Sequence, residues 1–117
     1  MERKFLKTHE WYCEKCNKIG ISDYAQHELG DIVYVELPSV GDPVEAGKAF
    51  GNVESVKGVS EVFSPVSGTV AEVNTDLESQ PELINQAPYD AWMIKVTPSA
   101  PAEGLLSEEE YQKLIAK

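Results

Sequence analysis

The sequence has no apolar run that approaches the roughly 20 residues a helix needs to cross a bilayer. It begins Met1-Glu2-Arg3-Lys4-Phe5, without a hydrophobic segment of the signal type. We therefore expect a cytoplasmic protein, with a mature mitochondrial form as the alternative left open. Basic residues are also scarce, because 10 Lys and Arg stand against 20 Asp and Glu for a net charge of −10. This balance disfavours nucleic acid and anionic membranes as partners, and it favours encounters with basic protein surfaces.

Cysteine and histidine are scarce, and their spacing does not favour a metal site. Cys13 and Cys16 form a single Cys-x-x-Cys, and His9 and His27 are the only histidines. A structural zinc site takes four ligands, so a Cys2His2 site is arithmetically possible, but the spacing fits no standard finger pattern. A thioredoxin-like motif belongs at a helix start in an α/β unit, which this sequence lacks. We expect no metal and two ordinary thiols in or beside the first hairpin.

What the sequence does contain is a series of short apolar runs separated by Gly and Pro. In 117 residues this pattern favours one domain with a compact β barrel or sandwich. The clearest strand covers residues 31–37, with Val33, Val35 and Leu37 on one face and Ile32 and Tyr34 on the other. Apolar residues on both faces predict burial on both sides. Further strands are predicted at residues 8–12, 19–21, 69–73 and 91–97, with a turn at 15–18.

Two short helices have clear start signals. Ser22 can accept a hydrogen bond from an early free N–H, and Gly30 is placed to end the helix that follows. Ile21, Ala25 and Leu29 would give this helix an apolar edge.

The second helix is predicted at about residues 107–116. Ser107 and Glu110 form a capping box, and Leu114 and Ile115 supply an apolar stripe. Between the predicted strands, residues 74–89 form a loop in which short helical turns are expected near 75–78 and 81–84.

Residues 49–68 are predicted to form a tight hairpin that presents Lys57 at its tip. Val56-Lys57-Gly58-Val59 places an X-Gly pair between β-branched residues. A primed two-residue turn needs the positive φ that glycine adopts without steric cost. An exposed lysine at a hairpin tip is most often only a solubilising residue. A stiff hairpin with one exposed amine nevertheless suits the covalent attachment of a swinging arm.

The sequence around this lysine carries several family motifs. They are Glu54-Ser55-Val56-Lys57, the Gly-Asp-x-Val-x-x-Gly pattern at 41–47, and Ser64-Pro65-Val66-Ser67-Gly68. In these motifs the chain resembles the glycine cleavage system H protein family. The resemblance runs from about Thr8 to Pro98 and includes His9-Glu10-Trp11, residues 19–37, residues 81–85, Pro88-Tyr89 and Trp92.

The resemblance implies a mainly β fold, a flattened β barrel-sandwich hybrid of the lipoyl/biotinyl type. Residues 1–117 would form a single lipoyl-carrier domain, with its core at about 8–98, short flanking helices and the C-terminal helix. The modified hairpin would project at one end of the domain.

The resemblance also implies a function. Lipoate in amide linkage to Lys57 would accept the aminomethyl group left after glycine loses carbon dioxide. It would carry this group from the glycine decarboxylase (P protein) to the aminomethyltransferase (T protein), and the dihydrolipoamide dehydrogenase (L protein) would then reoxidise it. A lipoyl ligase or transferase must first acylate the lysine, because an ammonium group cannot acylate itself. The chain would be a non-catalytic carrier and a monomer.

The same likeness assigns two further groups of residues. Glu54, with Gly41 and Gly68, would serve recognition by the lipoylating enzyme. Thr8, Glu10 and Glu61 would line a cleft that protects the loaded arm, with Glu10 either pairing with the aminomethyl cation or merely exposed on a strand. Glu61 stands where an Asp is common in the family.

The first hairpin departs most from the family, because Cys13-Glu14-Lys15-Cys16-Asn17-Lys18 is about two residues short and lacks the usual Gly. Near Trp92 the usual Gly is also replaced, by Asp90-Ala91.

Alternative functions stay open at this point. A biotinyl carrier domain normally has Met on both sides of its lysine, whereas Val56 and Gly58 stand here. A lipoyl domain of a 2-oxoacid dehydrogenase favours Asp-Lys-Ala. A lipoate relay or a regulatory H-like protein would share all the motifs, and the residues do not separate it from a carrier.

Overall fold

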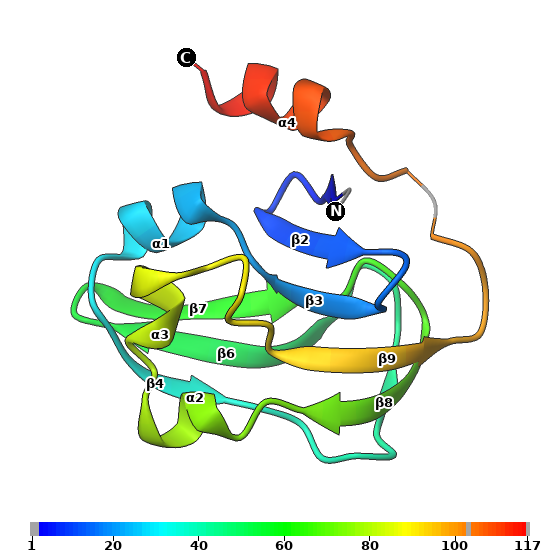
Figure 1. Ribbon diagram of the computed structural model, residues 1–117, viewed down its shortest axis with the longest axis horizontal. Coiled ribbons are helices and arrows are strands. Elements are labelled where there is room, and N and C mark those ends of the chain that lie inside the picture. The colour runs from blue at the N-terminus through cyan, green and yellow to red at the C-terminus, as the bar shows by residue number, and fades with distance from the viewer. Residues whose placement is uncertain (1–2, 103, 117) are drawn as a thin grey trace.

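The computed structural model describes residues 3–102 and 104–116, which form two antiparallel β-sheets and four short helices (Figure 1). Met1, Glu2, Glu103 and Lys117, which belong to the predicted domain, lie outside the described residues. A shared core joins the sheets, since Ile21 of one sheet packs in the same cluster as Val53 and Val62 of the other. The predicted mainly β architecture is therefore confirmed.

The larger sheet has the strand order β1-β2-β3-β9-β8-β5 and the smaller has the order β4-β6-β7. The strands of the larger sheet are β1 (Lys4–Phe5), β2 (Glu10–Cys13), β3 (Lys18–Ile21), β9 (Ile94–Pro98), β8 (Gly68–Val73) and β5 (Pro43–Val44). Those of the smaller sheet are β4 (Ile32–Glu36), β6 (Ala49–Ser55) and β7 (Gly58–Phe63). The helices are α1 (Asp23–Leu29), α2 (Asp76–Ser79), α3 (Leu83–Gln86) and α4 (Glu108–Ile115).

Strand β4 corrects one prediction. Ile32 and Val35 are buried, whereas Val33 and Tyr34 are 51% and 55% exposed. The pairing of β4 with β6 shifts register between Ile32 and Tyr34, and such a bulge interrupts the two-residue alternation of side chains. The strand is therefore buried on one face only, and the predicted burial on both faces is wrong.

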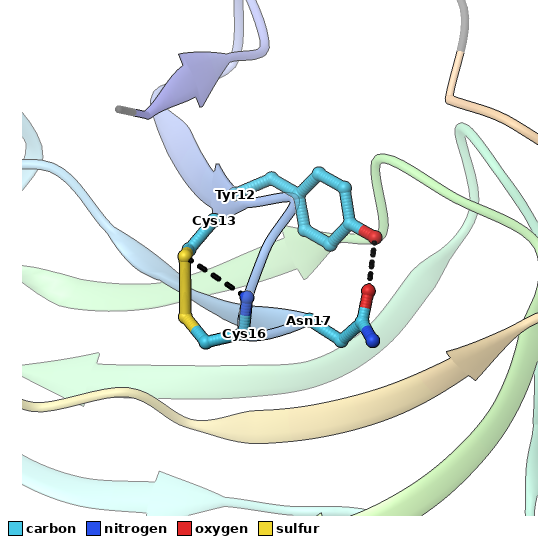
Figure 2. Close-up of a disulfide and its surroundings, with 4 residues drawn as sticks. All are labelled: Tyr12, Cys13, Cys16 and Asn17. Carbon is cyan, nitrogen blue, oxygen red and sulfur yellow. Dashed lines mark hydrogen bonds between the residues drawn. A yellow bond between two sulfur atoms is a disulfide. The ribbon is translucent and has the colours of Figure 1, made fainter. Parts of the chain in front are cut away.

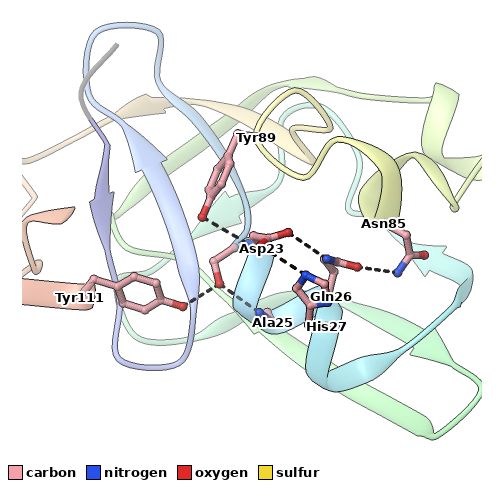
Figure 3. A network of polar contacts seen from close by, with 8 residues as sticks. Asp23, Ala25, Gln26, His27, Asn85, Tyr89 and Tyr111 are labelled. Atoms are coloured by element: carbon pink, nitrogen blue, oxygen red, sulfur yellow. Dashed lines mark hydrogen bonds and ion pairs between the residues drawn. The ribbon is translucent and has the colours of Figure 1, made fainter. Parts of the chain in front are cut away.

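Helix α1 begins and ends where the sequence predicts. The Ser22 hydroxyl accepts from the Ala25 N–H at 3.1 Å, and the Gly30 N–H returns to the Gln26 carbonyl at 3.0 Å with φ of +77°. A polar network holds the helix in place, in which Asn85 donates to the Gln26 side chain and to the Gly30 carbonyl (Figure 3). The Asn85 side chain of α3 thus fixes the position of the C-terminal end of α1.

Helix α4 has the predicted capping box, with both the Ser107 and the Glu110 side chains bonded to backbone N–H groups. Its main anchor is Tyr111, which the sequence reading did not single out. This side chain is fully buried, stacks on Phe5 at 4.2 Å and places its hydroxyl 2.6 Å from Ser22 Oγ (Figure 3). The predicted stripe of Leu114 and Ile115 packs less deeply on the same cluster.

Two predicted strands begin later than expected. Strand β2 starts at Glu10, because Thr8 and His9 lie in the preceding turn, where His9 has φ of +79°. Strand β9 starts at Ile94, so Trp92 lies outside it. Within the part of the chain that the structure describes, no helix is long and apolar enough to cross a membrane.

The two cysteines also correct a prediction. Cys13 and Cys16 are joined by a disulfide across the β2–β3 turn, and are not two ordinary thiols (Figure 2). Their Cα atoms lie 5.5 Å apart, a usual separation for bridged cysteines. Among residues 3–102 and 104–116, no group of three His, Cys, Asp or Glu side chains is placed to hold a metal ion.

Candidate functional site

Strands β6 and β7 form the predicted hairpin, and its turn consists of Val56 and Lys57 (Figure 1). Ser55 pairs with Gly58, so Gly58 is the first residue of β7 and not a central turn residue. Positive φ is confined here to Gly58, at 145°. The predicted position of Lys57 at the tip is right, but the predicted primed turn with Lys57-Gly58 at its centre is wrong.

Ser55 fixes the backbone of this turn. Its hydroxyl accepts from the Lys57 N–H at 3.1 Å and donates to the Gly58 carbonyl at 3.3 Å, and the side chain is buried. The Val56 N–H donates to the Asp31 carbonyl at 3.1 Å, which ties the tip to the chain between α1 and β4. The turn backbone is thus held by the Ser55 side chain and by the Asp31 carbonyl.

The Lys57 side chain is exposed and lies along the C-terminal end of α1. Its Nζ donates to the Glu28 carbonyl at 3.0 Å. Free carbonyls at the end of a helix attract cations, and such bonds at the surface are weak. A Cβ on Gly30 would lie 3.8 Å from Lys57 Cε, an ordinary contact distance, so Gly30 is needed here for its φ of +77° and not to admit the lysine. The amine is therefore placed by α1 and remains open to solvent for acylation.

A buried carboxyl group lies at the other end of β7. Glu10 is 2% exposed, and its two oxygens accept from the Thr8 hydroxyl and, at 2.8 Å, from the Phe63 N–H. Burial raises the pKa of Glu10 to about 7, although the hydrogen bonds from Phe63 and Thr8 oppose this shift. The alternative in which Glu10 is merely an exposed strand residue is wrong.

An open cavity of about 300 Å³ adjoins this carboxyl group. It is lined by Leu6, Lys7, Thr8, Gly47, Phe63 and Gly104. Thr8 and Phe63 both hydrogen-bond to Glu10, so the carboxyl group lies directly behind the cavity wall. Phe63 is six residues along β7 from Lys57, which corresponds to roughly 20 Å of strand. A tether on Lys57 would have to lie along β7 to reach this cavity.

Comparison with known proteins identifies the family. The model of the glycine cleavage H-protein family matches residues 3–117. The glycine cleavage system H protein of Halalkalibacterium halodurans is 54% identical over 99% of this chain and 94% of its own length. That of Geobacillus kaustophilus is 55% identical over 97% and 94%. The crystal structure of the H protein from Mycobacterium marinum superposes with a TM-score of 0.91 at 37% identity, covering 98% of this chain and 97% of the other.

The chain belongs to the glycine cleavage H-protein family. The family is the lipoyl-carrying subunit of the glycine cleavage system, and the close structural match agrees with a barrel-sandwich hybrid.

Within this H-protein fold, the predicted site residues fall into separate places. Glu54 is exposed on β6, three residues before Lys57, beside Tyr34 and Val59 in the neighbouring strands. Gly41 and Gly68 lie away from the hairpin turn. Gly41 donates to the Val70 carbonyl at 2.8 Å, and Gly68 is the first residue of β8.

The three predicted cleft residues are only partly brought together. Thr8 and Glu10 are in contact, and Thr8 lines the cavity. Glu61 is exposed on β7, pairs with Asn52 and is not among the lining residues.

Sequence reasoning missed the roles of three residues that shape the site, Ser55, Glu28 and Phe63. Ser55 had a local signal, because a Ser two residues before a turn position commonly bonds to the turn backbone. Glu28 and Phe63 act through contacts between distant segments, such as the hydrogen bond that joins Glu10 and Phe63 across 53 residues, and these contacts leave no local pattern.

Proposed function

We propose that Lys57 carries lipoate in amide linkage, and that the loaded chain moves the aminomethyl group between the enzymes of the glycine cleavage system. The observation that carries this proposal is one exposed primary amine on a turn fixed by Ser55 and by the Asp31 carbonyl. Membership of the H-protein family supports it. The chemistry belongs to the dithiolane, which opens by accepting a fragment on one sulfur, and the protein supplies tethering and orientation.

The partners that follow from this role are the glycine decarboxylase, the aminomethyltransferase, the dihydrolipoamide dehydrogenase and a lipoyl ligase or transferase. The lipoylating enzyme would recognise Glu54, with Gly41 and Gly68 supporting the fold that presents the hairpin. We propose that the chain is a monomeric, non-catalytic carrier in the cytoplasm.

The cavity beside Thr8 is the proposed resting place of the loaded arm. Glu10 would interact with the aminomethyl cation from behind the wall, and Glu61 would meet the arm on its way along β7. An ionised Glu10 suits this contact, and its pKa of about 7 makes that form accessible near neutral pH. Glu10→Ala would then hasten the loss of formaldehyde from the loaded arm, measured as released formaldehyde over time. An unchanged release rate would remove this role.

A reconstituted exchange reaction tests the carrier role. Glycine-dependent exchange of labelled carbon dioxide with purified decarboxylase should require the lipoylated chain. It should fall to background with Lys57→Arg, which keeps the charge but cannot be acylated in the same way. Lys48→Arg, at another exposed lysine, is the matched control and should retain full exchange. Exchange that proceeds without this chain would favour a lipoate relay over a carrier.

A further inference from the structure

No step of the proposed carrier function uses the Cys13–Cys16 disulfide. It crosses the β2–β3 turn (Figure 2). Cys16 lines a small cavity of about 160 Å³, and none of the lining residues belongs to the β6–β7 hairpin.

The two sulfur-bearing residues differ in access. Cys13 is fully buried, whereas Cys16 is half-buried and forms part of the cavity wall. The Cys16 N–H donates to Cys13 Sγ at 3.2 Å (Figure 2). A thiol that enters the cavity therefore meets Cys16. The N–H group would stabilise negative charge on the Cys13 sulfur as it leaves.

The residues that line the cavity carry a net charge of +1, in a protein of net charge −10. Arg3 and Lys18 line it together with one carboxylate, Asp90. The guanidinium of Arg3 lies 4.2 Å from the centre of the Tyr89 ring, and Lys18 Nζ lies 5.3 Å from that of Trp92. Both rings also line the cavity, so both cations are held at its wall by cation–π contacts.

We propose that the Cys13–Cys16 disulfide is a second thiol–disulfide exchange site of this chain, which reacts with small anionic thiols at Cys16 Sγ. The incoming thiolate bonds to Cys16 Sγ, the Cys13–Cys16 bond breaks, and Cys13 leaves as a thiolate that takes a proton from water. A second thiolate then attacks the mixed disulfide at the sulfur of the first thiol and releases Cys16. Two thiols are thereby oxidised to one small disulfide, and the protein disulfide is reduced to two thiols.

The β2–β3 turn is built to persist through this exchange. The Asn17 N–H donates to the Cys13 carbonyl at 2.7 Å, and Asn17 takes the left-handed conformation with φ of +57°. The Tyr12 hydroxyl donates to Asn17 Oδ1 at 3.0 Å (Figure 2). None of these contacts needs the disulfide, so the reduced chain keeps its hairpin.

The first experiment locates the reactive sulfur. The experiment uses the full chain with Lys57→Arg, so that no dithiolane can be attached to it. This protein is incubated with oxidised and reduced glutathione, quenched with acid and mapped by mass spectrometry. In the Cys13→Ser variant, Cys16 should form a stable glutathione adduct. In the Cys16→Ser variant, the buried Cys13 should react at least about tenfold more slowly. Circular dichroism checks that both variants are folded.

The second experiment tests the charge of the cavity with three small thiols of similar size: mercaptoacetate, 2-mercaptoethanol and cysteamine. Each thiol attacks as its thiolate, so mercaptoacetate, 2-mercaptoethanol and cysteamine carry net charges of −2, −1 and 0. Lys18→Gln should slow mercaptoacetate most, roughly threefold more than it slows 2-mercaptoethanol, the effect of one surface charge at about 7 Å in water. It should change the rate with cysteamine least. Lys48→Gln, at an exposed lysine that does not line the cavity, should change none of the three rates.

Three results would overturn the proposal. In the first, Cys13 and Cys16 stay as two thiols in oxidised glutathione. In the second, the glutathione adduct forms on Cys13 as readily as on Cys16. In the third, Lys18→Gln changes the reduction rate equally for all three thiols. Because the assay uses Lys57→Arg, each of these results is independent of whether Lys57 carries lipoate.

Discussion

Glu10 is the residue whose protonation state depends most on the fold. It is buried with two hydrogen-bond donors, and its pKa rises from 4.5 to about 7. The native state therefore binds a proton on Glu10 more tightly than the unfolded chain does. Below pH 4.5 both states are protonated and no penalty applies. As the pH rises from 4.5 to about 7, the unfolded chain ionises at this position while native Glu10 keeps its proton, so stability falls. Above about pH 7 the native state also ionises and bears a buried charge.

Glu10→Gln should remove this pH dependence. The size of the shift corresponds to about 3 kcal/mol of unfolding free energy lost by the wild type between pH 4.5 and 7. The amide keeps an oxygen for the Phe63 N–H, so the variant should stay folded. Urea unfolding of both proteins at several pH values measures the difference. Parallel stability curves for the two proteins would contradict the account.

The prediction of Lys57 at the tip succeeded because the lysine lies between two strand-like runs. The turn type could not be predicted in the same way. Lys57-Gly58 matches the pattern of a primed turn, but the Ser55 hydroxyl satisfies the turn backbone and moves the pair by one residue. The hydrogen bonds of the buried Ser55 side chain thus decide the turn, and not the preference of Gly58 for a central turn position.

Ser55→Ala should loosen this turn and leave the amine in place. The change removes one acceptor for the Lys57 N–H and one donor to Gly58, which would cost about 1–2 kcal/mol of stability. We expect slower acylation of Lys57 by a lipoyl ligase at saturating lipoate, with the site unchanged. The rate of mass gain measures it. Ser60→Ala, on the neighbouring strand, is the control, and equal rates for the two variants would exclude a role for Ser55.

At the scale of elements, the seven longer strands were predictable in approximate place, but the two-residue strands β1 and β5 were missed and the buried faces of β4 were not predicted. The alternation in β4 predicted burial on both sides, and the bulge after Ile32 exposes Val33 and Tyr34 instead. Helices α1 and α4 were predicted well, because their capping residues act within a few residues of the helix start. The Cys13–Cys16 disulfide was missed because a Cys-x-x-Cys does not by itself distinguish bridged from free thiols.

Two glycines outside the hairpin should differ sharply when replaced. A Cβ on Gly68 would lie 2.2 Å from the Thr97 carbonyl oxygen at the β8–β9 pairing, so Gly68→Ala should cost about 3 kcal/mol or more. Gly41 has φ of +95° but no atom within 4 Å of a Cβ, so Gly41→Ala should cost only about 1–2 kcal/mol. Thermal unfolding compares the two. A Gly68→Ala protein as stable as the Gly41→Ala protein would contradict the packing.

For the whole molecule, the sheet arrangement places the amine and the cavity at the two ends of β7. The sequence motifs predicted this carrier fold only through family likeness, because strand order depends on contacts between distant segments. In the larger sheet, for example, β3 near the start of the chain pairs with β9 near its end. Local patterns carry no information on such pairings.

The net charge of −10 predicts that encounters with partners depend on salt. With the glycine decarboxylase, raising the salt concentration from about 50 to about 500 mM shortens the screening length from roughly 14 to roughly 4 Å. We expect kcat/KM for the lipoylated chain to fall several-fold while kcat at saturation is retained. A kcat/KM that is independent of salt would show that the acidic surface does not guide association.

The central claim is that Lys57 is the single site of lipoate attachment, and intact mass with peptide mapping tests it most directly. Protein isolated from its own source, or treated with a lipoyl ligase and lipoate, should gain the mass of one lipoyl group. The peptide that contains Lys57 should carry it, and Lys57→Arg should gain none. A biotinyl mass, a bare Lys57 after complete ligase treatment, or a lipoyl group on another lysine would contradict the account.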